Sequence, residues 1–320
     1  MRDKMVFTKD SMKQKKVAVL YGGMSSERPV SLNSGEACCK ALKEKGYNVE
    51  LIDVGPDLAA QLTAKKIDVA FLALHGRYGE DGCVQGLLEV MGIPYSGSDV
   101  LASAAAMDKE TAKILFAAAG LPIVPHIVLL AGEKVPELPF SYPVVVKPNS
   151  EGSSFGVTIV KKPEDLPAAL AEAFKYDKVI HVEKFIAGKE ITSGVLNGKG
   201  LATLEIAVAK SAFYDYTAKY ECHENRYIVP APISDELNAR VLQLAERAYK
   251  VLRCSGAARA DLIVEEDATP DKGIYILEMN SLPGMTAASL LPKMAAYAGL
   301  TFGDLCEEIL LSAHNLKARE

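Results

Sequence analysis

The sequence predicts an α/β protein with α+β portions, arranged as three packed domains. A chain of 320 residues is longer than a usual single-core domain. Strands and helices alternate from residue 17 onward, which favours a parallel sheet covered by helices. Beyond about residue 125 the pattern changes to short apolar runs around single helices, as in α+β units. With 49% hydrophobic residues, the chain can bury a sizeable core.

The N-terminal part shows the alternation most clearly. Apolar runs or helical patterns occupy, in order, residues 17–20, 30–45, 48–53, 58–65 and 69–74. This is a βαβαβ order, so we expect an N-terminal α/β domain with a parallel sheet over residues 17–107.

Composition and the first residues exclude several classes of protein. Residues 1–16 are rich in Lys and Met, lack the apolar run of a secretory signal, and predict a flexible tail. No later segment reaches the roughly 18 apolar residues of a membrane span. The chain has 36 basic and 41 acidic residues, so a net charge of −5 gives no general attraction to nucleic acid. The six cysteines form no CxxC pair. These observations favour a cytoplasmic protein with neither a nucleic-acid nor a membrane partner.

The central part has a different character. Helical patterns over residues 82–91 and 98–120 end at Pro122 and Pro125. Short apolar runs then surround one helix at 163–174, and they cover residues 143–147, 157–160, 179–185 and 191–196. We expect a central domain over residues 108–196.

A third domain is expected over residues 197–320. It begins with a strand at 201–209 and continues with a polar, Tyr-rich stretch at 210–229 without clear periodicity. Long irregular segments inside compact domains are commonly functional lids, although a surface loop explains the same pattern. The remainder predicts a helix at 234–252, strands at 257–264 and 274–279, and two closing helices.

Four polar residues on the last two predicted strands point to a metal site. Arg259 and Asp261 stand two apart on one strand, and Glu278 and Asn280 stand two apart on the next. Since side chains alternate along a strand, each pair shares a face, and a hairpin would bring the pairs together. Three oxygen ligands without His or Cys suit Mg²⁺ shared with substrate phosphates. A polar sheet face exposed to water is the alternative.

Two segments of the central domain suit a nucleotide. Lys147 ends a strand, and the Gly/Ser-rich loop 151–156 that follows can donate backbone N–H groups to phosphate oxygens. Residues 183–186 end another strand, where backbone groups can pair with a base edge while Glu190 accepts from ribose hydroxyls. An ordinary hairpin loop and solvated charges at a strand end are the alternative interpretations.

The carboxyl ends of the N-terminal strands are a third candidate location, because open α/β sheets bind ligands there. The loop 22–28 follows the first strand, and its Glu27 can hold a ligand ammonium. His75 ends another strand and can join it, although a lone His at a strand end is more often structural. The turn 281–286 leads from Asn280 towards Ser289 and Leu290, beside the predicted metal.

Several motifs occur together and in order along the chain. They include G-G-M-S-S-E-R, L-H-G-R-x-G-E-D-G, V-V-K-P, E-G-S-S-x-G, F-Y-D-Y-x-A-K-Y, R-x-D and L-E-x-N-S-x-P-G-M-T-x-x-S-L. From about Val17 to about Leu311 the chain resembles the D-alanine–D-alanine ligases of the ATP-grasp superfamily. The resemblance implies a three-domain ATP-grasp architecture, in which ATP lies between the central and C-terminal domains.

The resemblance also implies a role for each matching residue. Those implied around ATP are Lys109, Lys147, Glu183, Phe185, Ile186, Glu190 and Lys219. The magnesium ligands would be Asp261, Glu278 and Asn280. Glu27 would hold the first D-alanine with His75 nearby, in a hydrogen-bonded triad with Ser153 and Tyr220. The oxyanion would lie against Arg259 and the Gly284 N–H, and the second carboxylate against Ser289 and Leu290.

The implied reaction joins two D-alanines through an acyl phosphate, for peptidoglycan precursors. It would use ATP and two magnesium ions, with manganese as a possible substitute, in a homodimer. Relatives that make D-alanyl-D-lactate generally lack the lid tyrosine found here at Tyr220, so the dipeptide is the favoured product. A D-alanyl-D-lactate former and a nucleotide-binding regulatory module without turnover are the alternatives.

Overall fold

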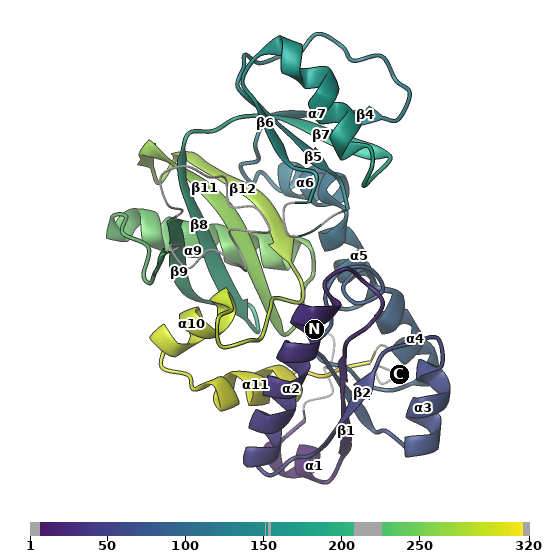
Figure 1. Cartoon of the computed structure of the whole chain (residues 1–320). Coiled ribbons are helices and arrows are strands. Elements are labelled where there is room, and N and C mark those ends of the chain that lie inside the picture. The colour runs from purple at the N-terminus through teal and green to yellow at the C-terminus, as the bar shows by residue number, and fades with distance from the viewer. Residues whose placement is uncertain (1–6, 151, 153–154, 208–225, 316–320) are drawn as a thin grey trace.

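Three sheets, each covered by its own helices, succeed one another along the chain in this computed structural model (Figure 1). The structure describes residues 7–150, 152, 155–207 and 226–315. No helix within those ranges is long and apolar enough to cross a membrane. Their five cysteines are free thiols, and four of them are buried.

The first sheet is parallel, with strand order β2-β1-β3. Its strands are β1 (Lys16–Tyr21), β2 (Asn48–Asp53) and β3 (Val69–Leu72). The helices of this part are α2 (Arg28–Glu44), α3 (Leu58–Lys65), α4 (Cys83–Met91) and α5 (Val100–Met107). Val17 to Leu20 of the central strand are fully buried because neighbouring elements cover both faces of the sheet. The predicted βαβαβ order and parallel sheet are confirmed.

The predicted flexible tail is wrong for the described residues before the first strand. They form helix α1 (Lys9–Lys13), where the hydroxyl of Thr8 accepts from the N–H of Ser11 in a capping box. Met12 is fully buried and packs in the same core as Leu42 of α2 and Leu305 of α11 (Phe302–Leu311). The buried Met12 attaches this segment to the core, together with an ion pair of 2.7 Å between Lys9 and Glu307 of α11.

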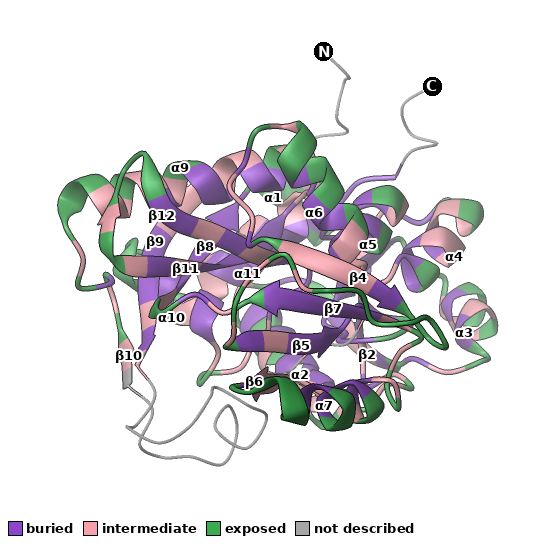
Figure 2. Ribbon diagram, turned by 90° about the horizontal axis from the view of Figure 1, so that it is seen from above, coloured by how far each residue is buried: buried purple, intermediate pink, exposed green. Residues whose placement is uncertain are grey.

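The second sheet is antiparallel, with strand order β4-β7-β5-β6. Its strands are β4 (His126–Leu130), β5 (Val144–Pro148), β6 (Thr158–Val160) and β7 (Val179–Lys184). A 3-10 turn (Pro163–Asp165) and α7 (Leu166–Ala173) cover one face, and in Figure 2 the outer side of α7 is largely exposed. Strand β4 was not predicted, because its residues are mostly half-exposed and its apolar run lies directly after two prolines.

The helix expected over residues 98–120 is two helices. Asp108 ends α5 in an extended conformation, and its carboxylate accepts from the N–H of Thr111 at 2.8 Å, which caps α6 (Lys109–Ala118). This break places Lys109 and Glu110 in the first turn of a new helix.

The third sheet is antiparallel, with strand order β10-β9-β8-β11-β12. Its strands are β8 (Gly188–Leu196), β9 (Lys199–Ala207), β10 (Arg226–Ile228), β11 (Ala257–Thr269) and β12 (Lys272–Asn280). α9 (Asp235–Val251) packs on one face, α10 (Leu290–Tyr297) packs against β9, and α11 lies against α2 of the first part.

Two expectations about this region need correction. β8 pairs with β9 and β11, so residues 188–196, which were expected in the central domain, belong to the third sheet. The stretch 210–229 was expected to be a lid loop, but residues 226–228 form β10 and pair with β9. Residues 210–225 lie outside the described part of the chain.

Candidate active site

A cavity of about 560 Å³ receives residues from all three parts of the chain. Eleven of the residues predicted from the sequence line it. They are Glu27, His75, Lys109, Glu190, Arg259, Asp261, Glu278, Asn280, Gly284, Ser289 and Leu290. Residues up to 263 positions apart in the chain thus meet in one space, between Glu27 and Leu290.

The predicted hairpin of β11 and β12 is confirmed and forms one wall. Arg259 lies opposite Asn280, and Asp261 lies opposite Glu278. The guanidinium of Arg259 donates two hydrogen bonds to the carboxylate of Asp261, at 2.9 and 2.8 Å. The hydroxyl of Thr192 on β8 donates a third at 2.6 Å, so the Asp261 carboxylate is fixed from two strands.

The same wall offers oxygen atoms to a divalent cation. Asp261, Glu278 and Asn280 supply two carboxylates and one amide, which is a donor set that suits Mg²⁺. The ammonium of Lys109 lies 3.3 Å from Glu278, and it comes from the first turn of α6. The two carboxylates attract a cation, and the neighbouring ammonium of Lys109 attracts the phosphate groups that such a cation would bind.

The loop after β1 carries Glu27 into the cavity. Gly22 has a φ of +71°, and a Cβ there would lie 2.2 Å from Oδ1 of Asp53, so glycine is required. Asp53 accepts from Arg28 at 2.7 and 2.6 Å, which attaches the loop to the end of β2. Glu27 then precedes α2, with its carboxylate beside Gly76 and Gly152. The Gly/Ser-rich loop therefore reaches Glu27 at Gly152, its described residue next to Ser153.

His75 connects the end of the first sheet to the turn after β12. Its Nδ1 donates to the carbonyl of Leu282 at 3.1 Å, and its Nε2 lies 3.3 Å from the hydroxyl of Ser34 on α2. Burial lowers the pKa of His75, so the ring is neutral and its Nε2 accepts the Ser34 hydrogen. His75 thus orients two elements at the edge of the cavity.

The turn after β12 leads directly into α10. The side-chain oxygen of Asn280 accepts from the N–H of Leu282 at 3.0 Å. Ser289 is the N-cap residue of α10, and its hydroxyl lies 3.0 Å from the N–H of Thr286. A Cβ on Gly284 would lie 2.8 Å from that hydroxyl and would displace it.

Four residues predicted near ATP are not among the residues that line the cavity. Glu183 is buried between two ammonium groups, with Lys113 at 2.7 Å and Lys147 at 2.9 Å. Burial acts to raise the pKa of Glu183, but the two lysines outweigh it and hold that pKa well below its ordinary value. The N–H of Phe185 donates to the carbonyl of Pro143 at 3.2 Å, and Ile186 is buried.

Sequence reasoning missed Glu80 and Lys113. Glu80 lines the cavity and is buried, and its Oε1 accepts from the N–H of Gly76 at 3.0 Å. Burial and the charge of Glu27 raise its pKa to about 8. Glu80 stands within the L-H-G-R-x-G-E-D-G motif, which was the available signal. Three predicted residues, Ser153, Lys219 and Tyr220, lie outside the described part of the chain.

Comparisons with known proteins give the family. The family model described as "D-ala D-ala ligase C-terminus" matches residues 115–311, and the corresponding N-terminus model matches residues 56–98. The D-alanine–D-alanine ligase of Geobacter sulfurreducens is 52% identical over 309 residues, which are 96% of each chain. That of Geotalea uraniireducens is 52% identical over 96% of this chain and 98% of its own. The chain belongs to the D-alanine–D-alanine ligase family.

A solved member of the family has the same fold. The crystal structure of the D-alanine–D-alanine ligase from Bacillus anthracis complexed with ATP matches with a TM-score of 0.82 and 36% identity. It covers 95% of this chain and 98% of its own. The three-domain architecture implied by the motifs is confirmed at the level of the whole fold.

Proposed function

We propose that this protein joins two D-alanine molecules into D-alanyl-D-alanine while ATP is converted to ADP and phosphate. One observation carries the proposal: a single cavity, in a chain 52% identical to ligases of this name, gathers Glu27, Arg259 and the oxygen donors of the β11–β12 hairpin. The product is a dipeptide unit for peptidoglycan precursors.

The first step activates a carboxylate. An oxygen of the first D-alanine's carboxylate attacks the γ-phosphorus of ATP, the bond to the β-phosphate oxygen breaks, and D-alanyl phosphate and ADP result. Glu27 holds the substrate ammonium, and the ammonium of Lys109 offsets negative charge on the phosphates. Asp261, Glu278 and Asn280 are the residues that would hold magnesium, which neutralises phosphate charge when bound.

The second step forms the peptide bond. The neutral amine of the second D-alanine attacks the acyl carbon, and the tetrahedral intermediate collapses by breaking the bond between that carbon and the phosphate oxygen. The departing phosphate takes up the proton that the nitrogen loses. Arg259 and the N–H of Gly284 are proposed to stabilise the oxyanion, and the position of both residues in the cavity lining supports this role. Ser289 and Leu290 at the start of α10 would bind the second carboxylate, since helix N-termini favour anions.

The remaining roles complete the proposal. The residues that would surround ATP, besides Lys109, are Lys147, Glu183, Phe185, Ile186, Glu190 and Lys219. His75 would line the first substrate's site. Ser153 and Tyr220 would connect the lid to Glu27. An acyl phosphate hydrolyses in water, which is the physical reason for a lid. Because the reaction consumes ATP, we place it in the cytoplasm. From the family resemblance we also propose that the protein is a homodimer, which light scattering can test.

Product analysis with purified protein tests this function. We expect phosphate release from Mg-ATP that depends on D-alanine and gives the mass of D-alanyl-D-alanine. L-alanine should give no product, and D-lactate offered beside D-alanine should compete poorly as second substrate. Bound ATP without release of phosphate in any mixture would contradict the proposal and favour a regulatory module. A dominant D-alanyl-D-lactate mass would contradict the choice of second substrate.

A further inference from the structure

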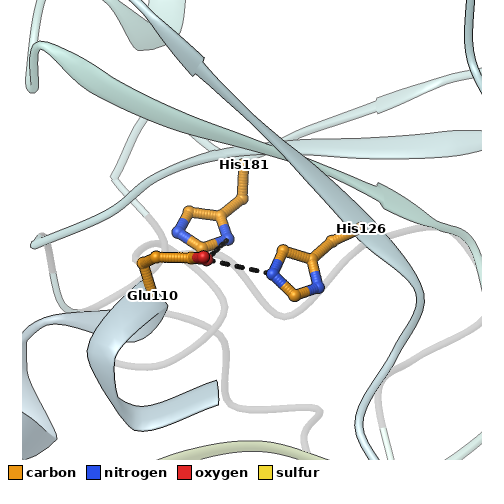
Figure 3. A group of neighbouring side chains, drawn as sticks. All are labelled: Glu110, His126 and His181. Carbon is orange, nitrogen blue, oxygen red and sulfur yellow. Dashed lines mark hydrogen bonds and ion pairs between the residues drawn. The ribbon is translucent and has the colours of Figure 1, made fainter. Parts of the chain in front are cut away.

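Three side chains outside the cavity converge on one point at the edge of the central sheet. Glu110 comes from the first turn of α6, and His126 and His181 come from the neighbouring strands β4 and β7 (Figure 3). Nε2 of His126 lies 3.0 Å from Oε2 of Glu110, and Nδ1 of His181 lies 4.0 Å from the same oxygen. One ligand atom from each residue lies within 4.8 Å of the others.

The hydrogen bonds of the two rings determine which nitrogens carry protons. Nδ1 of His126 lies 3.2 Å from the carbonyl of Val124, which can only accept, so this nitrogen donates. Nε2 of His181 lies 3.0 Å from the side-chain oxygen of Asn149, which also accepts from the N–H of Glu110 at 2.9 Å. In neutral rings, therefore, the nitrogens that face Glu110 are lone-pair acceptors.

Three hydrogen-bond acceptors therefore face one another: Oε2 of Glu110, Nε2 of His126 and Nδ1 of His181. His181 is fully buried, and no described residue donates a hydrogen bond to its Nδ1. Full burial disfavours a charged imidazolium, so Nδ1 of His181 remains a lone-pair acceptor. A proton on His126 would satisfy the pair that it makes with Glu110, but it would leave Nδ1 of His181 without a donor.

A metal ion satisfies all three groups at once. Zinc binds two His and one carboxylate at about 2.0–2.2 Å with one position left open, which separates tetrahedral ligands by about 3.3–3.5 Å. The 3.0 and 4.0 Å separations bracket that value. Metal-binding histidines almost always donate their other ring N–H to a carbonyl or similar oxygen, as His126 and His181 both do. We propose that Glu110, His126 and His181 bind a zinc ion.

The surroundings allow such an ion and suggest what it does. The nearby cations Lys113 and Lys147 share the single carboxylate of Glu183, so Glu110 is the anionic group that directly contacts the metal. The side chains of Glu110 and His126 are 31% and 13% exposed, which gives an ion a route from solvent. An ion here would join the first turn of α6 to β4 and β7, next to Lys109. The zinc proposal holds whether or not the proposed ligase function is correct.

Metal binding to purified, chelator-treated full-length protein tests the proposal. Saturating Mg²⁺ is kept present so that the oxygen site of the cavity is filled, and Zn²⁺ is titrated by calorimetry. We expect one zinc per chain and a rise in melting temperature. Co²⁺ in place of Zn²⁺ should give visible absorption typical of four-coordinate nitrogen and oxygen ligation, without a thiolate charge-transfer band.

Variants locate the ion. H181L, H126Q and E110Q should each weaken zinc binding by about 100-fold or more, since even outer partners of metal ligands contribute about 10- to 100-fold. E172Q, on the exposed face of α7, serves as a matched control and should bind zinc like the parent protein. If H181L does not fold, H126Q and E110Q still test the proposal, because His126 and Glu110 are partly exposed and their replacement should leave the fold intact. A parent protein that binds no zinc, or variants that bind it unchanged, would overturn the proposal.

Discussion

Glu80 gives the sharpest prediction about the cavity. Its carboxyl is buried beside Glu27, and its pKa is raised from 4.5 to about 8. A folded-state pKa above the unfolded value means that the folded protein binds the extra proton, so this contribution to stability is present below pH 4.5 and is lost as pH rises towards 8. At about 1.4 kcal/mol per unit, the full loss is about 5 kcal/mol.

Glu80→Gln removes this pH dependence while it keeps the shape of the protonated side chain. The amide oxygen of Gln can still accept from the N–H of Gly76, as Oε1 of Glu80 does. Between pH 5.5 and 8.5 the variant should therefore gain about 3 kcal/mol relative to the parent protein. That gain corresponds to about 4–5 °C in melting temperature for a chain of this size.

The assay is thermal unfolding of the ligand-free proteins at constant ionic strength across this pH range. Differences between variant and parent protein cancel the titration of all groups that do not interact with Glu80. Glu172→Gln, which changes an exposed glutamate, should show a constant difference from the parent. The reasoning about Glu80 is refuted if its variant also runs parallel to the parent from pH 5.5 to 8.5.

Three further substitutions test the backbone and the metal wall. Gly22→Ala should lower the free energy of unfolding by about 2 kcal/mol more than Gly46→Ala, as measured by denaturant unfolding. Both glycines have a positive φ, but only at Gly22 would the added Cβ clash with Oδ1 of Asp53. Equal losses would remove the role of the clash. Gly284→Ala should lower kcat/KM by about 100-fold in a phosphate-release assay, with little change in melting temperature, because the added Cβ would lie 2.8 Å from the hydroxyl of Ser289. Normal activity of this variant would argue against the oxyanion site. Glu278→Gln should lower turnover at least about 100-fold with the fold intact by circular dichroism, and near-normal turnover would exclude it as a magnesium ligand.

Much of the fold could be predicted because local pattern and tertiary structure agree. The alternation from β1 to β3 fixes a parallel sheet, since its strands are buried on both faces and its helices are amphipathic. The spacing of Arg259, Asp261, Glu278 and Asn280 predicted that each pair shares a face and that a hairpin brings the pairs together. Their exact register could not be predicted, because two register shifts lie between them and the turn.

The errors come from contacts that local pattern does not contain. α1 is attached by Met12, whose partners lie on helices near both ends of the chain. β8 continues from the central part without a break in sequence, and only its pairing with β11 shows that it belongs to the third sheet. His126 and His181 are 55 residues apart on strands whose pairing the sequence does not reveal, so neither was singled out.

The central claim is that the carboxylate of the first D-alanine becomes an acyl phosphate in this cavity. The most direct test supplies D-alanine labelled with ¹⁸O in both carboxylate oxygens, together with Mg-ATP, and measures the released phosphate by mass spectrometry. We expect each phosphate released with dipeptide formation to carry one ¹⁸O, because that oxygen bridged carbon and phosphorus. Unlabelled phosphate accompanying the dipeptide would contradict it.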